Sequence, residues 1–389
     1  MEIDKSLREE NVQSLSLSIS IVFLVFILMS STFNSFIIKP LLRDGSIIAH
    51  GRYMITFDAL DTVENDEGAS VVAIGSSITR ASIDGSCIEN FSNTQDLEIY
   101  NLGLSAANPY TEMMQLTALI NSNPDIVLLE AGVNSFWDID SQNRTGGLDD
   151  GGGGIDENSY IEFRMRLNSI LMDNSDFGNW TEIVRERDRE FLLDDLFSRN
   201  GEISKYSNEA VEELISRFIL DQSNAAKTTS WLRAPETSDE SWEDYLSTPN
   251  YRIGVWNNGS MIEDWDAWFE NNMEARSKFG EFNPQHSGTL FHTVMEHIVE
   301  ELTRNGITVV LIAAPRNPMV FDYLVPGQTD GLNSSLSNLT ISDDVIVENM
   351  FWETWDKDEF LDRNHLNNNG RQKMCEILAP KIDTILAGE

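Results

Sequence analysis

The chain contains 389 residues, of which 41% are hydrophobic, so it can bury a substantial core and is not a wholly disordered protein. Its 64 acidic and 27 basic residues give a formal net charge of −37. This charge argues against a nucleic-acid-binding function, because phosphate recognition requires Lys and Arg. It is typical of a solvated acidic surface, as in proteins from salty surroundings.

An apolar segment near the N-terminus predicts a membrane anchor. Residues 13–38 contain no charged side chain, and a helix of that length can span a hydrocarbon core of about 30 Å. The segment is longer than the apolar region of a cleavable signal peptide and lacks a small-x-small cleavage site. We therefore expect a cytoplasmic tail over residues 1–12, a transmembrane anchor over 13–38, a linker over 39–67 and a globular domain over 68–389.

The orientation of the anchor is less well defined. Basic residues flank both of its ends, so the positive-inside rule does not decide between the two orientations. Large domains translocate largely regardless of their charge, which favours a single-pass protein of the cell membrane with an extracytoplasmic domain. Six N-x-[ST] sequons follow the anchor and mildly support that side, although their glycosylation stays open. They begin at Asn90, Asn143, Asn179, Asn258, Asn333 and Asn338.

Apolar runs that alternate with helical patterns predict an α/β fold. Strands are expected at residues 70–74, 97–100, 125–130, 307–314 and 344–348. Helices are expected at residues 109–120, 289–304 and 369–386. Because the strands are continuously apolar, both faces of the sheet should be covered. We therefore expect a three-layer arrangement, in which a parallel sheet is flanked by helices.

Residues from about 138 to 285 interrupt this alternation and predict a mostly helical insertion, or cap. The segment begins near the run GLDDGGGG and is later rich in tryptophan. The aromatic rings either form the core of the cap, which we favour, or form a platform that stacks on sugars. The tryptophans are Trp231, Trp242, Trp256, Trp265 and Trp268.

The sequence gives no indication of a metal or cofactor. His292 and His297 are five residues apart on a predicted helix, which turns them to different faces. Residues 151–156 resemble one unit of a calcium-binding glycine repeat, but the unit occurs once, so a plain loop is favoured. Cys87 and Cys375 both lie in predicted helices beside apolar residues. This favours buried free thiols, with a disulfide as the alternative.

Residues suited to nucleophilic catalysis follow the predicted strands. Ser77 lies in IGSSIT, Gly103 in NLGLSAANP and Asn134 in AGVNSF, while Asp362 and His365 lie in DRNH. A serine hydroxyl needs a neighbouring base, a histidine supplies it, and a carboxylate orients the imidazole. Fixed N–H groups stabilise the oxyanion that develops. Because ligands bind at the carboxyl ends of parallel strands, these residues should meet at one edge of the sheet.

The four segments resemble, in order, the four sequence blocks of the SGNH (GDSL-type) hydrolase superfamily. The resemblance implies an SGNH hydrolase, flavodoxin-like fold, with Ser77 as nucleophile, His365 as base and Asp362 as the group that orients it. It further implies an oxyanion hole formed by the N–H groups of Ser77 and Gly103 and the amide of Asn134.

The resemblance covers roughly residues 68–137 and 286–386 and departs from the family pattern at two positions. The first block, usually Gly-Asp-Ser, ends here in Ser76 and Ser77, which makes Ser76 a rival nucleophile. Ser135 stands where the third block usually has Asp, which concerns the local loop and no member of the triad.

In its tether, its first-block variant and its insertion, the chain resembles the envelope-bound branch of the superfamily. That branch includes alginate-acetylation and D-alanyl-transfer type proteins. This implies a serine esterase or O-acyltransferase that forms an acyl-serine on a cell-envelope glycan or other surface polymer. Arg316, just past the fourth strand, is a candidate substrate contact or else a partner of a surface acid. The alternative function is a catalytically inactive glycan-binding or scaffold protein on the same fold. A partner from envelope biosynthesis stays unidentified.

Overall fold

The computed structural model describes the greater part of the α/β domain and shorter stretches elsewhere. The described residues are 15–22, 25, 32–43, 56–57, 60, 63, 68–104, 107–132, 135–136, 171–172, 174–187, 210–211, 214–215, 266–267, 290–323, 328–352 and 354–388. Asn134, the five tryptophans of the predicted cap and the glycine run at 151–154 lie outside these residues.

A single five-stranded sheet forms the centre of the domain, in the order β2-β1-β3-β4-β5. The strands are β1 (Ala69–Ile74), β2 (Leu97–Asn101), β3 (Ile126–Glu130), β4 (Thr308–Ala313) and β5 (Val345–Asn349). All neighbouring strands are parallel. The α/β class and the parallel sheet predicted from the sequence are therefore confirmed. In this order the connections reverse direction between β1 and β3, so the crevice that binds ligands should open beyond the carboxyl ends of these two strands.

The strands are continuously apolar because both of their faces are buried. Along β1, Val72 and Ile74 belong to one hydrophobic cluster, whereas Val71 and Ala73 belong to the cluster on the opposite face. Successive side chains of a strand point to opposite faces, so a covered sheet requires an apolar residue at every position.

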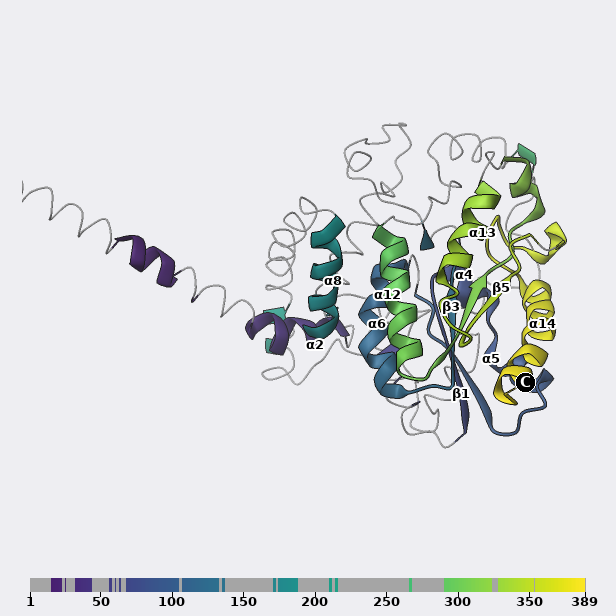
Figure 1. Ribbon diagram of the computed structural model, residues 1–389, viewed down its shortest axis with the longest axis horizontal. Helices are drawn as coiled ribbons and strands as arrows, with labels where there is room; N and C mark the ends of the chain where they lie inside the picture. Colours follow the sequence, from purple (N-terminus) through teal and green to yellow (C-terminus); the bar gives the residue numbers. More distant parts are fainter. Residues whose placement is uncertain are drawn as a thin grey trace, which may run out of the picture.

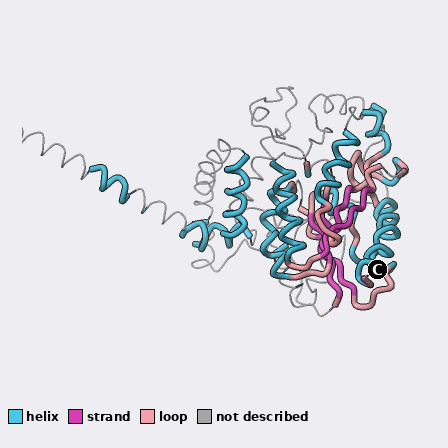
Figure 2. Tube along the Cα trace, in the orientation of Figure 1, coloured by secondary structure: helices cyan, strands magenta, loops and turns pink. Residues whose placement is uncertain are grey.

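Helices cover both faces of the sheet, as Figures 1 and 2 show. The first face packs against α6 (Pro109–Ser122), α12 (Leu290–Arg304) and α13 (Gln328–Leu339), with α8 (Asn174–Arg187) beyond α6 and α12. The second face packs against α5 (Gly85–Phe91) and α14 (Asn368–Leu386). In α12 the buried residues Val294, Ile298 and Leu302 recur every four positions, which places them on one stripe toward the sheet.

The end of the predicted anchor and the start of the predicted linker pack against the domain. Residues Asn34–Ile38 form the π-helix η1 and Lys39–Arg43 form α2. Ile38 and Leu41 are 0% and 4% exposed within the first hydrophobic cluster, and Lys39 Nζ donates to the carbonyl of Met172 at 2.5 Å. The last residue of the predicted anchor and part of the predicted linker therefore contribute to the core.

Only part of the predicted anchor belongs to the described residues. Residues 15–22 are helical, and their apolar side chains, such as Leu15 and Ile19, are largely exposed. In the portion of the chain that the structure describes, no helix has both the length and the apolar character needed to cross a membrane.

Cys87 on α5 and Cys375 on α14 form a disulfide with a Cα–Cα distance of 5.9 Å. The favoured prediction of two free thiols is therefore wrong, and the alternative that we left open is correct. The two helices pack against each other on one face of the sheet, although the cysteines are 288 residues apart in the chain. Sequence spacing carries no information on such a contact.

Candidate active site

The first candidate segment is a tight turn from β1 into α4 (Ser77–Ser82), with Ser76 as the N-cap residue. Gly75 adopts a φ of +149°, a conformation that L side chains rarely adopt. A Cβ atom at Gly75 would lie 2.3 Å from Thr79 Oγ1 and 2.5 Å from Glu130 Cβ. Only glycine therefore allows the turn that presents Ser77 at the start of the helix.

Ser77, His365 and Asp362 form one hydrogen-bonded chain. Ser77 Oγ lies 2.8 Å from His365 Nε2, and His365 Nδ1 lies 2.7 Å from Asp362 Oδ2. With its proton on Nδ1, the imidazole donates to the carboxylate and its Nε2 accepts from the serine hydroxyl. The side chains of His365 and Asp362 are 18% and 23% exposed, so the chain borders solvent. The geometry allows His365 to remove the proton of Ser77.

Asp362 is held as an ionised acceptor. Its Oδ1 accepts the backbone N–H groups of Asn364 at 2.8 Å and of His365 at 2.9 Å, which leaves Oδ2 for the imidazole. Burial acts to raise the pKa of Asp362, but the charge of His365 and these hydrogen bonds outweigh it and lower the pKa below its ordinary value. The carboxylate can therefore fix both the tautomer and the orientation of the ring.

The loop that carries Asp362 and His365 is closed at its base. Phe360 and Leu366 form an antiparallel bridge, and Leu361 N donates to His365 O at 2.8 Å. From the segment between β4 and the 3-10 helix Pro318–Tyr323, the backbone N–H of Asn317 donates to the carbonyl of Arg363 at 3.1 Å. The loop is therefore braced both within itself and against the segment after β4.

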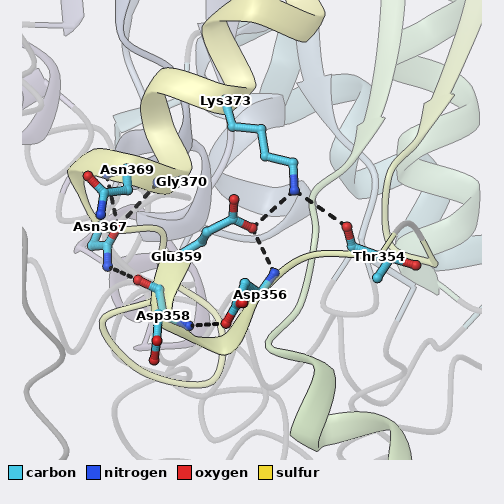
Figure 3. A network of polar contacts seen from close by, with 8 residues as sticks. All are labelled: Thr354, Asp356, Asp358, Glu359, Asn367, Asn369, Gly370 and Lys373. Atoms are coloured by element: carbon cyan, nitrogen blue, oxygen red, sulfur yellow. Dashed lines mark hydrogen bonds and ion pairs between the residues drawn. The ribbon is translucent and has the colours of Figure 1, made fainter.

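Asn367 connects this loop to α14 and to the short helix η4 (Lys357–Glu359), as Figure 3 shows. Its Oδ1 accepts the N–H groups of Asn369 and Gly370 and caps the helix, while its Nδ2 donates to the Asp358 carbonyl at 2.7 Å. Asn367 is fully buried. A Cβ atom at Gly370 would lie 2.4 Å from the Glu359 carbonyl oxygen, so glycine permits the close approach.

Charged contacts reinforce the same junction. Lys373 Nζ pairs with Glu359 Oε2 at 3.1 Å and lies 4.2 Å from the centre of the Trp355 ring (Figure 3 shows the ion pair). Glu359 also accepts the N–H of Asp356 at 2.8 Å and completes a capping box on η4. Glu359 lies two residues before Leu361, where the Asp362 loop begins. Its contacts therefore fix the start of that loop.

The residues predicted to form the oxyanion hole are only partly brought together. Ser77 N–H lies at the first position of α4, where helix N–H groups have no partner within the helix. Gly103 lies beside the turn, since a Cβ there would be 2.8 Å from Ser76 O, but its N–H donates to Asn101 Oδ1 at 3.1 Å. Asn134 lies outside the described residues.

Ser76, the rival nucleophile, has a different environment. Its side chain is buried, and its hydroxyl donates to the carboxylate of Glu130, with Oε1 and Oε2 at 2.9 and 2.8 Å. The same oxygen accepts Ile78 N–H. The geometry therefore favours Ser77 over Ser76 as the reactive serine. Ser135, the second departure from the family pattern, is also buried, and its hydroxyl donates to the Glu130 carbonyl at 3.0 Å, which closes the turn after β3.

Arg316 lies beside the loop after β3 and not on the surface. It is 4% exposed, its guanidinium lies 5.8 Å from the centre of the Phe351 ring, and its Nη2 would be 3.7 Å from a Cβ built on Gly132. Gly132 belongs to the third candidate segment, so Arg316 borders the predicted site. A substrate contact stays a prediction.

The sequence analysis missed three residues that hydrogen-bond the turns and loops around the candidate site: Glu130, Asn101 and Asn367. Glu130 ends a wholly apolar strand and is 3% exposed, and a carboxylate can be buried there only if donors surround it. An acidic residue at the end of an apolar strand was therefore the one sign in the sequence that Glu130 has a special role. Asn101 ends β2 and donates to the carbonyl of Ile83 at 2.6 Å, which joins β2 to the end of α4.

The histidines of α12 are engaged in packing. His292 is fully buried, with its ring 5.8 Å from that of Phe136, and burial lowers the pKa of His297 below its ordinary value. Among the residues that the structure describes, no three His, Cys, Asp or Glu side chains come together in a group that could hold a metal ion.

Comparisons with known proteins add no family to this geometry. No protein-family model matches the chain, and no curated protein matches its sequence. The resemblance to SGNH hydrolases therefore rests on the four segments themselves, three of which the structure places together at the carboxyl edge of the sheet or directly beside it.

Proposed function

We propose that this protein is a membrane-anchored serine esterase or O-acyltransferase on an SGNH hydrolase fold, acting through an acyl-serine intermediate. One observation carries the proposal, namely the continuous hydrogen-bonded chain from Ser77 Oγ through His365 to Asp362. The strand order and the position of Ser77 directly after β1 are further support, because open α/β sheets bind their ligands at this switch point.

The reaction would proceed in two balanced steps. Ser77 Oγ attacks the ester carbonyl carbon while His365 Nε2 takes its proton, and collapse of the tetrahedral intermediate breaks the bond to the leaving oxygen, which receives that proton. In the second step His365 removes a proton from water or from a sugar hydroxyl, whose oxygen attacks the acyl carbon. The bond from that carbon to Ser77 Oγ then breaks, and Ser77 Oγ takes the proton back from His365. Water as the acceptor gives an esterase, and a sugar hydroxyl gives an O-acyltransferase.

A substrate in the cell envelope is supported by three features. The helical residues 15–22 expose apolar side chains in the segment predicted to be an anchor. The disulfide between Cys87 and Cys375 fits an oxidising, extracytoplasmic compartment. The resemblance to the envelope-bound branch adds a glycan or other surface polymer as the acyl acceptor or donor, and Arg316 as a candidate contact with it.

The second candidate is a catalytically inactive glycan-binding or scaffold protein tethered to the membrane. The hydrogen bond from Gly103 N–H to Asn101 Oδ1 favours it, because that N–H group is predicted to stabilise the oxyanion. An active enzyme would have to release this donor or rely on Ser77 N–H and Asn134.

The test is labelling of the full chain in detergent with a fluorophosphonate probe, together with turnover of p-nitrophenyl acetate. The full chain is needed because Ile38 and Leu41 are part of the core. We expect wild type to react, Ser77→Ala and His365→Ala to lose turnover, and mass spectrometry of the labelled peptide to place the probe on Ser77. A folded wild type that neither labels nor turns over would favour the binding protein.

A further inference from the structure

Glu130 occupies an unusual position for an acidic residue. It is the last residue of β3, the strand that pairs with β1, and it is 3% exposed beneath the turn that carries Ser77. Burying a carboxylate this deeply is strongly unfavourable unless polar groups surround it. Its surroundings are therefore informative about its role.

Two residues that flank Ser77 supply all the hydrogen bonds described for the Glu130 carboxylate. Ser76 donates its backbone N–H at 2.7 Å and its hydroxyl at 2.8 Å to Oε2. Thr79 donates its backbone N–H at 3.3 Å and its hydroxyl at 2.7 Å to the same oxygen. Because Ser77 lies between these two residues, the carboxylate holds the backbone on both sides of it.

The same network determines which N–H group of the helix remains for a ligand. Three of the four first-turn N–H groups of α4 are engaged: Ile78 N–H by Ser76 Oγ, Thr79 N–H by Glu130 and Arg80 N–H by the Ser76 carbonyl. For Ser77 N–H the described residues show no acceptor. Among these four first-turn donors, the described hydrogen bonds therefore leave only the N–H of Ser77 without an acceptor.

From this geometry we infer that Glu130 is the positioning residue of the nucleophile turn. Its carboxylate fixes Ser77 so that Oγ meets His365 while N–H is left for the oxyanion of the substrate. The inference deepens the proposed function and rests on it. Glu130 touches neither His365 nor the position of the attacked carbonyl in the described contacts, so it acts through Ser76 and Thr79.

The experiment compares Glu130→Gln and Glu130→Leu with a matched control, Glu112→Gln. Gln keeps one acceptor oxygen, whereas Leu removes both. Glu112 is a second buried carboxyl next to Glu130, at 1% exposure, but its Oε2 accepts no hydrogen bond from the described residues. Thr79→Val provides a milder variant that removes a single donor.

Fluorophosphonate labelling of the full chain separates positioning from folding. The final amplitude gives the fraction of competent molecules, and the rate constant gives the reactivity of each. We expect the rate constant and kcat to fall about 10-fold in Glu130→Gln and about 100-fold in Glu130→Leu, as a displacement of about 1 Å would cause. Thr79→Val should fall a few-fold, and Glu112→Gln should match wild type.

Three results would overturn the inference. A lower amplitude with an unchanged rate constant would limit Glu130 to a role in stability. An equal fall of the rate constant in Glu112→Gln would mean that altering either buried carboxyl has the same effect, so that Glu130 has no specific role. A shift in the midpoint of the kcat/KM pH profile that accounts for the rate loss would make the effect one of charge on His365. All three results require that wild type reacts with the probe. If wild type does not react, the proposed function itself fails, and this result is distinguishable from the other three.

Discussion

Cys87 and Cys375 are 288 residues apart in the chain, the same separation as Ser77 and His365. The disulfide therefore joins the same two segments as the hydrogen bond between Ser77 and His365, ten residues further along each. A third contact follows, in which Asp383 accepts hydrogen bonds from Ser92, Asn93 and Thr94. The segments 77–94 and 365–383 thus lie side by side in the same direction, and the candidate site is at one end of this pairing.

The first prediction concerns the disulfide. Replacing both cysteines by alanine should lower the stability by roughly 5 kcal/mol, the loss expected when a loop of this length is no longer closed, if the loss is entropic. Thermal unfolding measured with and without reductant checks this. Reductant should lower the Tm of wild type and leave the double variant unchanged. An equal response in both proteins would show that the effect of the reductant lies elsewhere.

The second prediction concerns the acid of the triad. Asp362→Asn keeps the size of the side chain but removes the charge that holds the imidazole tautomer, so kcat should fall on the order of 10³- to 10⁴-fold. Turnover of p-nitrophenyl acetate measures it, with unfolding curves as the control for an intact fold. A loss of less than tenfold would mean that His365 does not depend on Asp362.

The third prediction concerns Asn367, which joins the Asp362 loop to α14. Asn367→Ala removes a helix cap and leaves the Asp358 carbonyl without its donor, which should lower the stability by about 1–3 kcal/mol. Asn367→Ser retains a capping oxygen without turning a second acceptor toward that carbonyl, and should lose less. Chemical denaturation ranks the two variants, and the reverse order would contradict the capping role.

The fourth prediction is a pH dependence that arises from Glu112. Burial and then the charge of Glu130 raise the pKa of Glu112 well above its ordinary value. A raised pKa in the folded state favours folding at low pH, and this contribution is lost as the pH rises from about 4.5 through the raised value. Glu112→Gln should therefore gain stability relative to wild type as the pH increases from 4.5 to 8. A Tm difference that stays constant over this range would contradict the assignment.

The strands could be predicted from the sequence because a buried parallel sheet requires continuous apolar runs, such as that of β4. Helix α12 was predicted from its strong apolar periodicity. In contrast, α13 has a polar composition with a glycine and several serines, and it is held by the burial of Leu332, Leu336 and Leu339 against the sheet, a contact that local sequence does not specify.

The candidate site divides in the same way. Ser77, Asp362 and His365 could be predicted because each follows a strand or precedes the last helix in a distinctive short pattern. The role of Glu130 could not be, since it depends on the pairing of β1 with β3, which brings Ser76 next to a residue 54 positions later. The engagement of Gly103 N–H by Asn101 likewise depends on one side-chain orientation at the end of β2.

The pairing of segments 77–94 and 365–383 determines when their contacts can form during synthesis of the chain. During synthesis Ser77 emerges 288 residues before His365, so a growing chain that has not reached His365 cannot form the hydrogen bond between the two. Cys87 likewise emerges 288 residues before Cys375, so the disulfide can form only after α14 has been synthesised and has packed against α5. The hydrogen bond and the disulfide thus depend on the same late segment of the chain, residues 365–375.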